Sequence, residues 1–320
     1  MSIDLTSLAS TSKLLLNVPL EPIQGSRFQP TGFPDLGAAT YQAGPTQCLL
    51  VESAQSMANR LEQTVWDSGA NDLRQSAKGL SYVCVKDEDG NYLTSSIEEA
   101  HRLNSVYIEK SEGDIHETLK DEIGFDGKRP VDQGKFLKTV LKYDVNSLLH
   151  GLFLESIGGR LRIPRAISAF IEAENVEVAA SGGVKNDNVQ PGTEKGSEQT
   201  AKEGYGNVPY HREEYTADEI TAFFNLDLGQ IRGYGLGEKV ERLLILLALY
   251  KIRAFLDGEL RLRTACDLNV KEASITSDRG FELPALDELN EALPEAIQEC
   301  ASSFNGENGV TTVTWAKTKK

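Results

Sequence analysis

Apolar residues recur along this chain with two different spacings, and the spacing changes from segment to segment. Residues 47–52 form a short run rich in apolar side chains, which predicts a strand leading directly into a helix at Ser53. That helix places its apolar side chains on one face: Ala54, Met57, Ala58, Leu61 and Val65. Because serine is a preferred N-cap residue, we expect the helix to begin there. A further strand is predicted over 80–86, closed by a polar turn at 87–91.

The second half of the chain continues this mixture of patterns. Residues 166–180 are apolar and β-branched and predict a strand, regular structure resumes over 215–228, and the alternation of 260–270 predicts a strand with one buried face. The glycine-rich run 233–237 opens a helix from Glu238 to about Leu256, whose apolar residues extend most of the way round, as in a core helix. This order predicts an α+β fold, an antiparallel sheet with helices on one face, for which the ferredoxin-like arrangement is the commonest host.

Between the predicted elements lie segments that are too long and too polar for simple turns. Residues 87–145 are expected to be an insertion, helical in pieces, with an acidic first part and a basic second part. Residues 181–206 are polar and rich in glycine, so 181–214 is expected to be a second, loop-like insertion. The segment 282–307 holds seven acidic residues and no Lys or Arg, which predicts an acidic C-terminal helix and tail over 282–320. All of this fits a single domain across residues 1–320.

Charge is strongly segregated along the chain. The 320 residues contain 33 Lys and Arg against 48 Asp and Glu, a net charge of -15, and the pI is about 4.8. Residues 128–165 nevertheless hold eight basic and three acidic side chains. An acidic pI argues against a protein that binds nucleic acid over its whole surface, but a local basic groove could still bind RNA. We therefore expect faces of opposite sign.

Cysteine usage and hydropathy exclude several classes of protein. Cys48, Cys84, Cys266 and Cys300 are widely spaced and form no CxxC pair, which argues against a zinc site and against a disulfide framework. The longest apolar run, 243–250, is far shorter than the roughly 20 residues that a membrane span needs. The N-terminus lacks the features of a secretory signal, and we expect a cytoplasmic protein with reduced thiols.

The candidate anion-binding residues are arginines beside glycines. Arg160, Arg162 and Arg165 follow Gly158–Gly159, and guanidinium groups bind phosphate with two parallel hydrogen bonds where glycine lets the backbone approach closely. The alternative is a solvated basic edge that forms salt bridges with the acidic insertion. Arg27, between a Gly-Ser pair and an aromatic-proline turn, is a further candidate, or else a turn residue without a binding role.

Catalytic and cofactor signals are weak. The run 233–237 lacks the Lys-Ser/Thr ending of a nucleotide P-loop, so ATP binding is not expected. No pair of carboxylates has a convincing metal-ligand spacing, Asp227 and Asp267 included, and we expect neither metal nor cofactor. His211, flanked by Tyr210 and Arg212, is the best candidate for a general base in RNA cleavage; the alternative is a histidine that packs or contacts RNA.

An ordered set of short phrases resembles one known family. The phrases lie at residues 27–33, 50–53, 59–62, 148–151, 162–166, 170–173, 181–185, 206–212 and 227–237. In this order, from about residue 25 to 270, they resemble the backbone subunit of the type I Cascade surveillance complex of CRISPR systems, subtype G (formerly U), in the RAMP superfamily.

The resemblance implies an architecture and a role. It implies an RRM-like or ferredoxin-like palm with thumb and finger insertions, and 181–214 is the expected thumb. It implies several copies lined up along one CRISPR guide RNA, beside other Cascade subunits, with the guide held by its backbone and its spacer presented for pairing with target DNA. Such a subunit is not an enzyme, because a recruited helicase-nuclease cuts the target.

The resemblance also implies which residues meet the guide RNA. In the wider family the first helix begins with a Ser/Gln-rich turn that contacts phosphates, and the matching positions here are Ser53, Gln55, Ser56, Asn59 and Arg60. Asn59 stands where related subtypes often carry lysine, which weakens the electrostatic attraction at that position. The other residues expected to bind RNA are Arg27, Gln29, Arg160, Arg162, Arg165, Lys185, His211, Arg212 and Arg232.

Two other functions stay open at this stage. One is a metal-independent endonuclease that processes repeat RNA through His211, and it predicts cleavage of a repeat hairpin that His211→Ala abolishes. The other is an acidic interaction protein without RNA, and it predicts a monomer that purifies free of nucleic acid.

Overall fold

The architecture is built around one large antiparallel sheet. The computed structural model describes residues 3–33, 36–112, 115–159, 161–185, 208–258, 260–271 and 275–315. Seven strands pair antiparallel in the order β16-β17-β1-β15-β12-β5-β4. Their bounds are Lys13–Pro22 for β1, Thr40–Ala43 for β4, Thr46–Glu52 for β5, Ile167–Glu174 for β12, Glu219–Asp227 for β15, Arg261–Arg263 for β16 and Cys266–Val270 for β17. The α+β class predicted from the sequence is confirmed.

One face of this sheet is the main core. Alternate residues of β1 are buried, as a strand with one covered face requires: Leu14, Leu16, Val18 and Leu20. Helix α7 (Glu238–Gly258) packs against this face, where Phe255 meets Phe224 of β15 edge to face at 6.3 Å. Helix α1 (Ala54–Gln63) lies beside α7 and against β12. The long core helix predicted from Glu238 is therefore confirmed.

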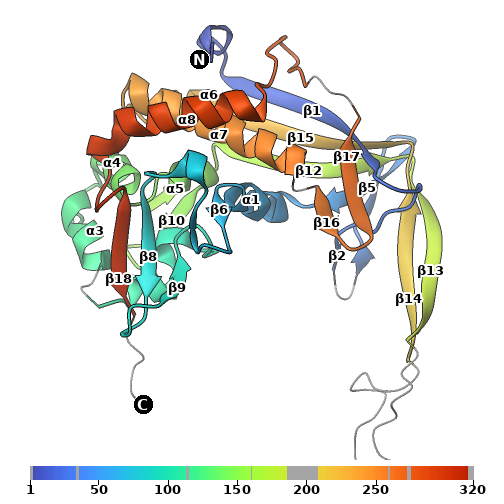
Figure 1. The fold of residues 1–320 in the computed structure, drawn as a ribbon, viewed down its shortest axis with the longest axis horizontal. Coiled ribbons are helices and arrows are strands. Elements are labelled where there is room, and N and C mark those ends of the chain that lie inside the picture. The colour runs from blue at the N-terminus through green and yellow to red at the C-terminus, as the bar shows by residue number, and fades with distance from the viewer. Residues whose placement is uncertain are drawn as a thin grey trace, which may run out of the picture.

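A second lobe fills the space at one end of the sheet. It contains η2 (Gln75–Ala77), β8 (Tyr82–Lys86), β9 (Tyr92–Ser95), η3 (Arg102–Asn104), α2 (Val106–Glu109), α3 (Ile115–Ile123), α4 (Gln133–Tyr143), α5 (Asn146–His150), β10 (Leu152–Leu154) and β11 (Leu161–Ile163). The acidic C-terminal segment forms helix α8 (Leu286–Cys300) against α7, and then strand β18 (Val310–Thr314), which pairs parallel with β8. Strand β18, in a segment expected to be a helix and tail, thus closes this lobe (Figure 1).

At the opposite end a two-stranded arm leaves the sheet. Strands β13 (Glu177–Lys185) and β14 (Val208–Thr216) pair antiparallel from Glu177–Thr216 to Lys185–Val208, and residues 186–207 lie outside the described part. The second insertion is therefore a hairpin at its base, where the sequence predicted a loop. Figure 1 shows the arm and the lobe extending from the same side of the sheet, so that they flank a concave side on which α1 lies.

The structure corrects two predicted strands and supplies one that the pattern missed. The strand expected over 260–270 is two strands, β16 and β17; Leu260, Leu262, Cys266 and Leu268 are all buried, so the alternation continues across the turn and conceals it. The strand expected over 166–180 breaks at Asn175, whose φ of 52° is a left-handed conformation that asparagine tolerates better than most residues. Strand β1, central in the sheet, was not predicted.

Candidate nucleic-acid interface

The first turn of α1 and Arg165 form one unit. Ser53 caps the helix, its Oγ accepting a hydrogen bond from the backbone N–H of Ser56 at 3.2 Å, as the sequence predicted. The Arg165 guanidinium donates to Gln55 Oε1 at 2.6 Å and to the carbonyl of Ala54 at 3.3 Å. Four of the predicted RNA-binding residues therefore meet at a helix N-terminus, which favours an anion.

Arg60, although predicted as part of the same surface, lies in a different environment. Its Nε lies 3.2 Å from Glu52 Oε1 and its Nη2 donates to the carbonyl of Leu262 at 2.6 Å. Glu52 is buried and also accepts a hydrogen bond from Arg263, so one carboxylate holds two guanidinium groups. This contact joins α1 to β16, and the carboxylate neutralises one of the two positive charges. Asn59, one residue earlier, is exposed.

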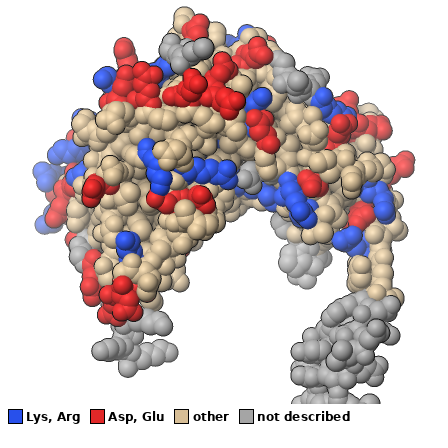
Figure 2. Space-filling model, viewed as in Figure 1, with Lys and Arg blue, Asp and Glu red and all other residues tan. Residues whose placement is uncertain are grey.

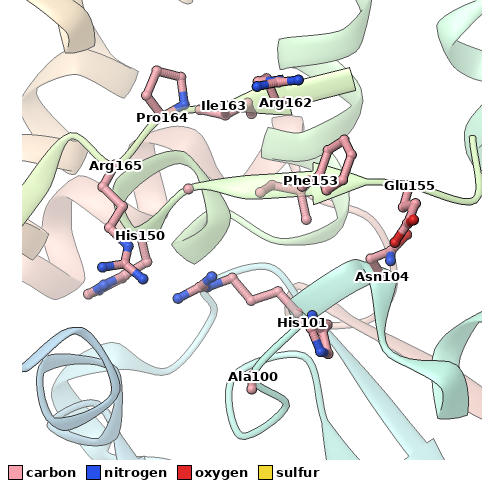
Figure 3. Close-up of a pocket in the computed structure, with 13 residues that line it drawn as sticks. Ala100, His101, Asn104, His150, Phe153, Glu155, Arg162, Ile163, Pro164 and Arg165 are labelled. Atoms are coloured by element: carbon pink, nitrogen blue, oxygen red, sulfur yellow. The ribbon is translucent and has the colours of Figure 1, made fainter. Parts of the chain in front are cut away.

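Arg162 and Arg165 line a pocket of about 490 Å³ on the lobe side of α1. Its walls come from η3, the end of α5, and the pair β10–β11 with the residues that follow β11. Figure 3 shows Arg165 and His150 at one end, Phe153 and Arg162 on the strand pair, and His101 on the opposite wall. The exposed Arg162 lies with its guanidinium carbon 5.6 Å from the centre of the Phe153 ring.

Gly158, the first glycine of the pair before β11, serves packing. Gly158 has a φ of 72°, and a Cβ there would lie 2.1 Å from Cζ of Phe125, so the missing side chain makes room for this ring. The expectation that Gly158 lets a phosphate approach the backbone closely is therefore wrong, because the Phe125 ring occupies that space. Gly159 has a φ of 63° and open surroundings. Arg160 lies outside the described residues.

The remaining predicted residues lie near the arm or apart from it. Gln29, His211 and Arg212 line a pocket of about 580 Å³ together with Arg263. Arg27 and Arg212 both contact the buried Glu214, at 3.4 Å and 2.6 Å. His211 is exposed on β14, and no hydrogen bond orients its ring among the described residues. Lys185 ends β13, and Arg232, on α6 (Leu228–Gly233), donates to the carbonyl of Thr11.

A buried polar cluster supports the pocket from behind. Arg102, with a φ of 52°, forms a bidentate ion pair with Glu62, both distances being 2.6 Å, and Asn146 Nδ2 donates to the same carboxylate at 2.9 Å. Burial raises the pKa of Asp144 to about 7, and burial lowers the pKa of Lys251 to about 7. Because Arg102 belongs to η3 and Glu62 to α1, their ion pair fixes η3, which forms one wall of the pocket, to α1.

Basic and acidic side chains lie on different parts of the surface. Figure 2 shows Lys and Arg side chains strung across the middle of the face that Figure 1 presents, while Asp and Glu gather along its upper edge, over α8. Within the described residues, no group of three or more His, Cys, Asp or Glu side chains could hold a metal ion. No helix of that part is long and apolar enough to cross a membrane. On this one face the basic side chains are therefore concentrated in the middle and the acidic side chains at the upper edge.

Comparison with known proteins supplies a family. A family model described as CRISPR-associated protein GSU0053 matches residues 14–178, more than half of the chain. The chain belongs to this CRISPR-associated family. The matched residues include α1, β11 and Arg165, and they end at the start of the arm.

Solved structures give more distant likenesses. A chain of a structure titled "CRISPR RNA-guided surveillance complex, pre-nicking" is 14% identical, with 80% of this chain and 76% of that chain covered and a TM-score of 0.40. Csc2 from Thermofilum pendens is 10% identical, with 93% and 82% covered and a TM-score of 0.31. No curated protein matches. Both TM-scores lie below 0.5.

Sequence reasoning missed the residues that decide which arginines are available. Glu52, Glu214 and Arg263 lie in strands, where a charged residue looks like part of a solvated face. Glu52 is 1% and Glu214 6% exposed, and each carboxylate binds two arginines that are far apart in sequence. The polar positions of the alternating segment 260–270 were a signal for Arg263, although they did not show its partner.

Proposed function

We propose that this chain is the guide-RNA-binding backbone subunit of a Cascade-type CRISPR complex, of subtype I-G in the RAMP superfamily. In this role the subunit is not catalytic. Several copies follow one guide RNA in the cytoplasm and present its spacer to target DNA, beside other Cascade subunits and a recruited helicase-nuclease. Membership of a CRISPR-associated family and the chemistry of the concave side support this proposal.

The observation that carries the proposal is a pair of arginines without a carboxylate partner. Within the described part of the chain, Arg162 and Arg165 form no ion pair, whereas Arg27, Arg60, Arg212, Arg232 and Arg263 all do. Arg165 lies beside the N-terminus of α1, whose free N–H groups add to the positive potential, and Arg162 lines the same pocket. Guanidinium groups in such a position suit the phosphates of a single strand.

The topology supports a palm of the RRM type. Strands β17, β1, β15 and β12 are neighbours in this order, and each pairs antiparallel with the next. Helix α1 lies between β1 and β12 in the chain, and α7 between β15 and β17. This is the connection pattern of a split βαββαβ unit, in which β4 and β5 extend one edge and β16 the other. The arm β13–β14 corresponds to the proposed thumb.

The proposal is tested on the complex purified with its genomic neighbours from cells that carry its repeat array. We expect the wild-type complex to retain RNA of uniform length, one repeat handle plus one spacer. Replacing Arg162 and Arg165 by glutamine should remove most of this RNA, because two positive charges without a carboxylate partner are lost.

The matched control removes the same number of positive charges at two exposed arginines elsewhere. Arg129 and Arg279 are 79% and 62% exposed, and the variant Arg129→Gln with Arg279→Gln should keep its RNA. Equal RNA content in the two double variants, or heterogeneous RNA in an intact wild-type complex, would refute the proposal.

A further inference from the structure

The pocket beside Arg165 contains a buried polar group without a partner. His150, the last residue of α5, is 1% exposed, and neither of its ring nitrogens has a hydrogen-bond partner within the described residues. Leaving a buried polar group unpaired is costly, and native proteins rarely do so without a reason. His150 also lines the pocket, so a molecule bound there could supply the missing partner.

The charges that face His150 show what kind of partner is missing. Burial lowers the pKa of the His150 ring, and the basic groups of Lys251, Arg102 and Arg165 lower it further. Arg102 is balanced by Glu62, and Lys251 donates to the carbonyl of Leu61 at 3.3 Å. Arg165 has only neutral acceptors, Gln55 and the Ala54 carbonyl. This end of the pocket therefore has an excess of donors and positive charge, and it lacks a hydrogen-bond acceptor with negative charge.

The other end of the pocket suits a planar apolar group. The Phe153 ring, on β10, is 43% exposed, and Arg162 stands over it from β11. Pro164 and the backbone of Gly151 line the stretch between the two ends, where a Cβ on Gly151 would lie 2.9 Å from the carbonyl oxygen of Ile163. A volume of about 490 Å³ is far larger than one phosphate needs and falls within the range of small-molecule sites.

We propose that this pocket binds one nucleotide, with its phosphate between Arg165 and His150 and its base stacked on Phe153. His150 donates one ring N–H to the phosphate, Arg165 donates its remaining N–H groups, and Arg162 closes over the base. Recognition by stacking accepts any base, since every base has a π-face. The assignment rests on the proposed function for its source, a nucleotide within the bound RNA strand.

Crosslinking tests the assignment on the intact complex. Cells that carry the repeat array are grown with 4-thiouridine, the purified complex is irradiated at long wavelength, and the adducts are located by mass spectrometry. We expect an adduct at Phe153 or its immediate neighbours. Phe153→Ala should abolish it, whereas Tyr107→Ala, a change at an aromatic ring of similar exposure (38%), should leave it intact. RNA that stays bound but crosslinks only to other parts of the chain would overturn the inference and leave the proposed function standing.

A second measurement separates an RNA nucleotide from a free one. The full chain is titrated with adenosine 5′-monophosphate and, separately, with a 12-residue single-stranded RNA. Phe153→Ala should weaken RNA binding about tenfold. His150→Phe should also weaken it, and His150→Gln, which can still donate, should restore it. If only the mononucleotide binds through Phe153, its source is free nucleotide, and if neither ligand responds to Phe153→Ala, the pocket is not a nucleotide site.

Discussion

The two groups of arginines on the concave side have the same chemistry and opposite availability. Arg60 and Arg263 share the buried Glu52, and Arg27 and Arg212 share the buried Glu214. Arg162 and Arg165, at the lobe end of the same surface, have no carboxylate partner in the described structure. The first group holds α1, β16 and the arm in place, and under the proposed function the second group is the one that binds the guide RNA. The number of arginines on a surface therefore says little until their partners are known.

The largest loss of stability is expected when Glu52, the carboxylate that Arg60 and Arg263 share, is replaced. Glu52→Gln leaves Arg60 and Arg263, each about a quarter exposed, without a counter-ion, and should lower the free energy of unfolding by about 3 to 5 kcal/mol. Glu214→Gln should cost much less, because Arg27 is 57% exposed and Arg212 35%. Urea unfolding of the two variants checks this order. Equal losses would show that Glu52 is not the more important support.

A smaller effect on stability is expected from the ionisation of Asp144, in the buried cluster behind Arg162 and Arg165. Burial raises the pKa of Asp144 to about 7, so folding favours its protonated form. A raised carboxyl pKa contributes stability that is fully present below the unfolded pKa of about 3.9 and is lost as pH rises towards 7. From about pH 4 to about pH 6 the wild-type chain should therefore lose on the order of 2 kcal/mol relative to Asp144→Asn.

Thermal unfolding of the wild type and Asp144→Asn at matched pH values checks this prediction. Asp144 accepts from Ser147 at 2.7 Å on one oxygen and from the Asn146 N–H at 3.2 Å on the other, and asparagine keeps one of these acceptors. Because asparagine does not ionise, the pH dependence of the difference between the two proteins reports the ionisation. Parallel pH profiles for the two proteins would contradict the assignment of this titration to Asp144.

The glycines next to the second group should respond unequally to alanine. Gly158→Ala places a Cβ 2.1 Å from the Phe125 ring at a φ of 72° and should destabilise the chain by about 2 to 3 kcal/mol. Gly159→Ala meets only the backbone cost at a φ of 63°, about 1 kcal/mol. Denaturant midpoints measure both, and RNA content per folded molecule should not change. A larger loss for Gly159→Ala would show that Phe125 does not set the difference.

The smallest effect is expected at His211, near the first group. The ring is exposed and no described residue orients it, so His211→Ala should leave both the length and the amount of the co-purified RNA nearly unchanged. Sequencing of that RNA provides the check. Unprocessed repeat transcripts in the variant would favour the endonuclease reading instead.

Prediction from the sequence succeeded where the signal was local. The cap at Ser53, the strand before it and the helix from Glu238 are all present, because capping and hydrophobic periodicity depend on neighbours in the chain. Strand β1 was missed, although Leu14, Leu16, Val18 and Leu20 alternate, and the turn at 264–265 was concealed by an alternation that continued across it. The sequence named the candidate arginines as a set, and their role in RNA binding stays a prediction; their ion-pair partners were not visible in the sequence.

The amino-acid sequence alone determined the α+β class, the segregation of charge and a short list of candidate phosphate-binding side chains. These follow from composition and from spacing over a few residues. Only the tertiary structure decided which arginines stay available, because Glu52 meets Arg263 across 211 positions and Glu214 meets Arg27 across 187. It also placed Phe153, Arg165 and the unpaired His150 around one pocket. Ion pairing and burial depend on distances in space, and a linear pattern does not contain them.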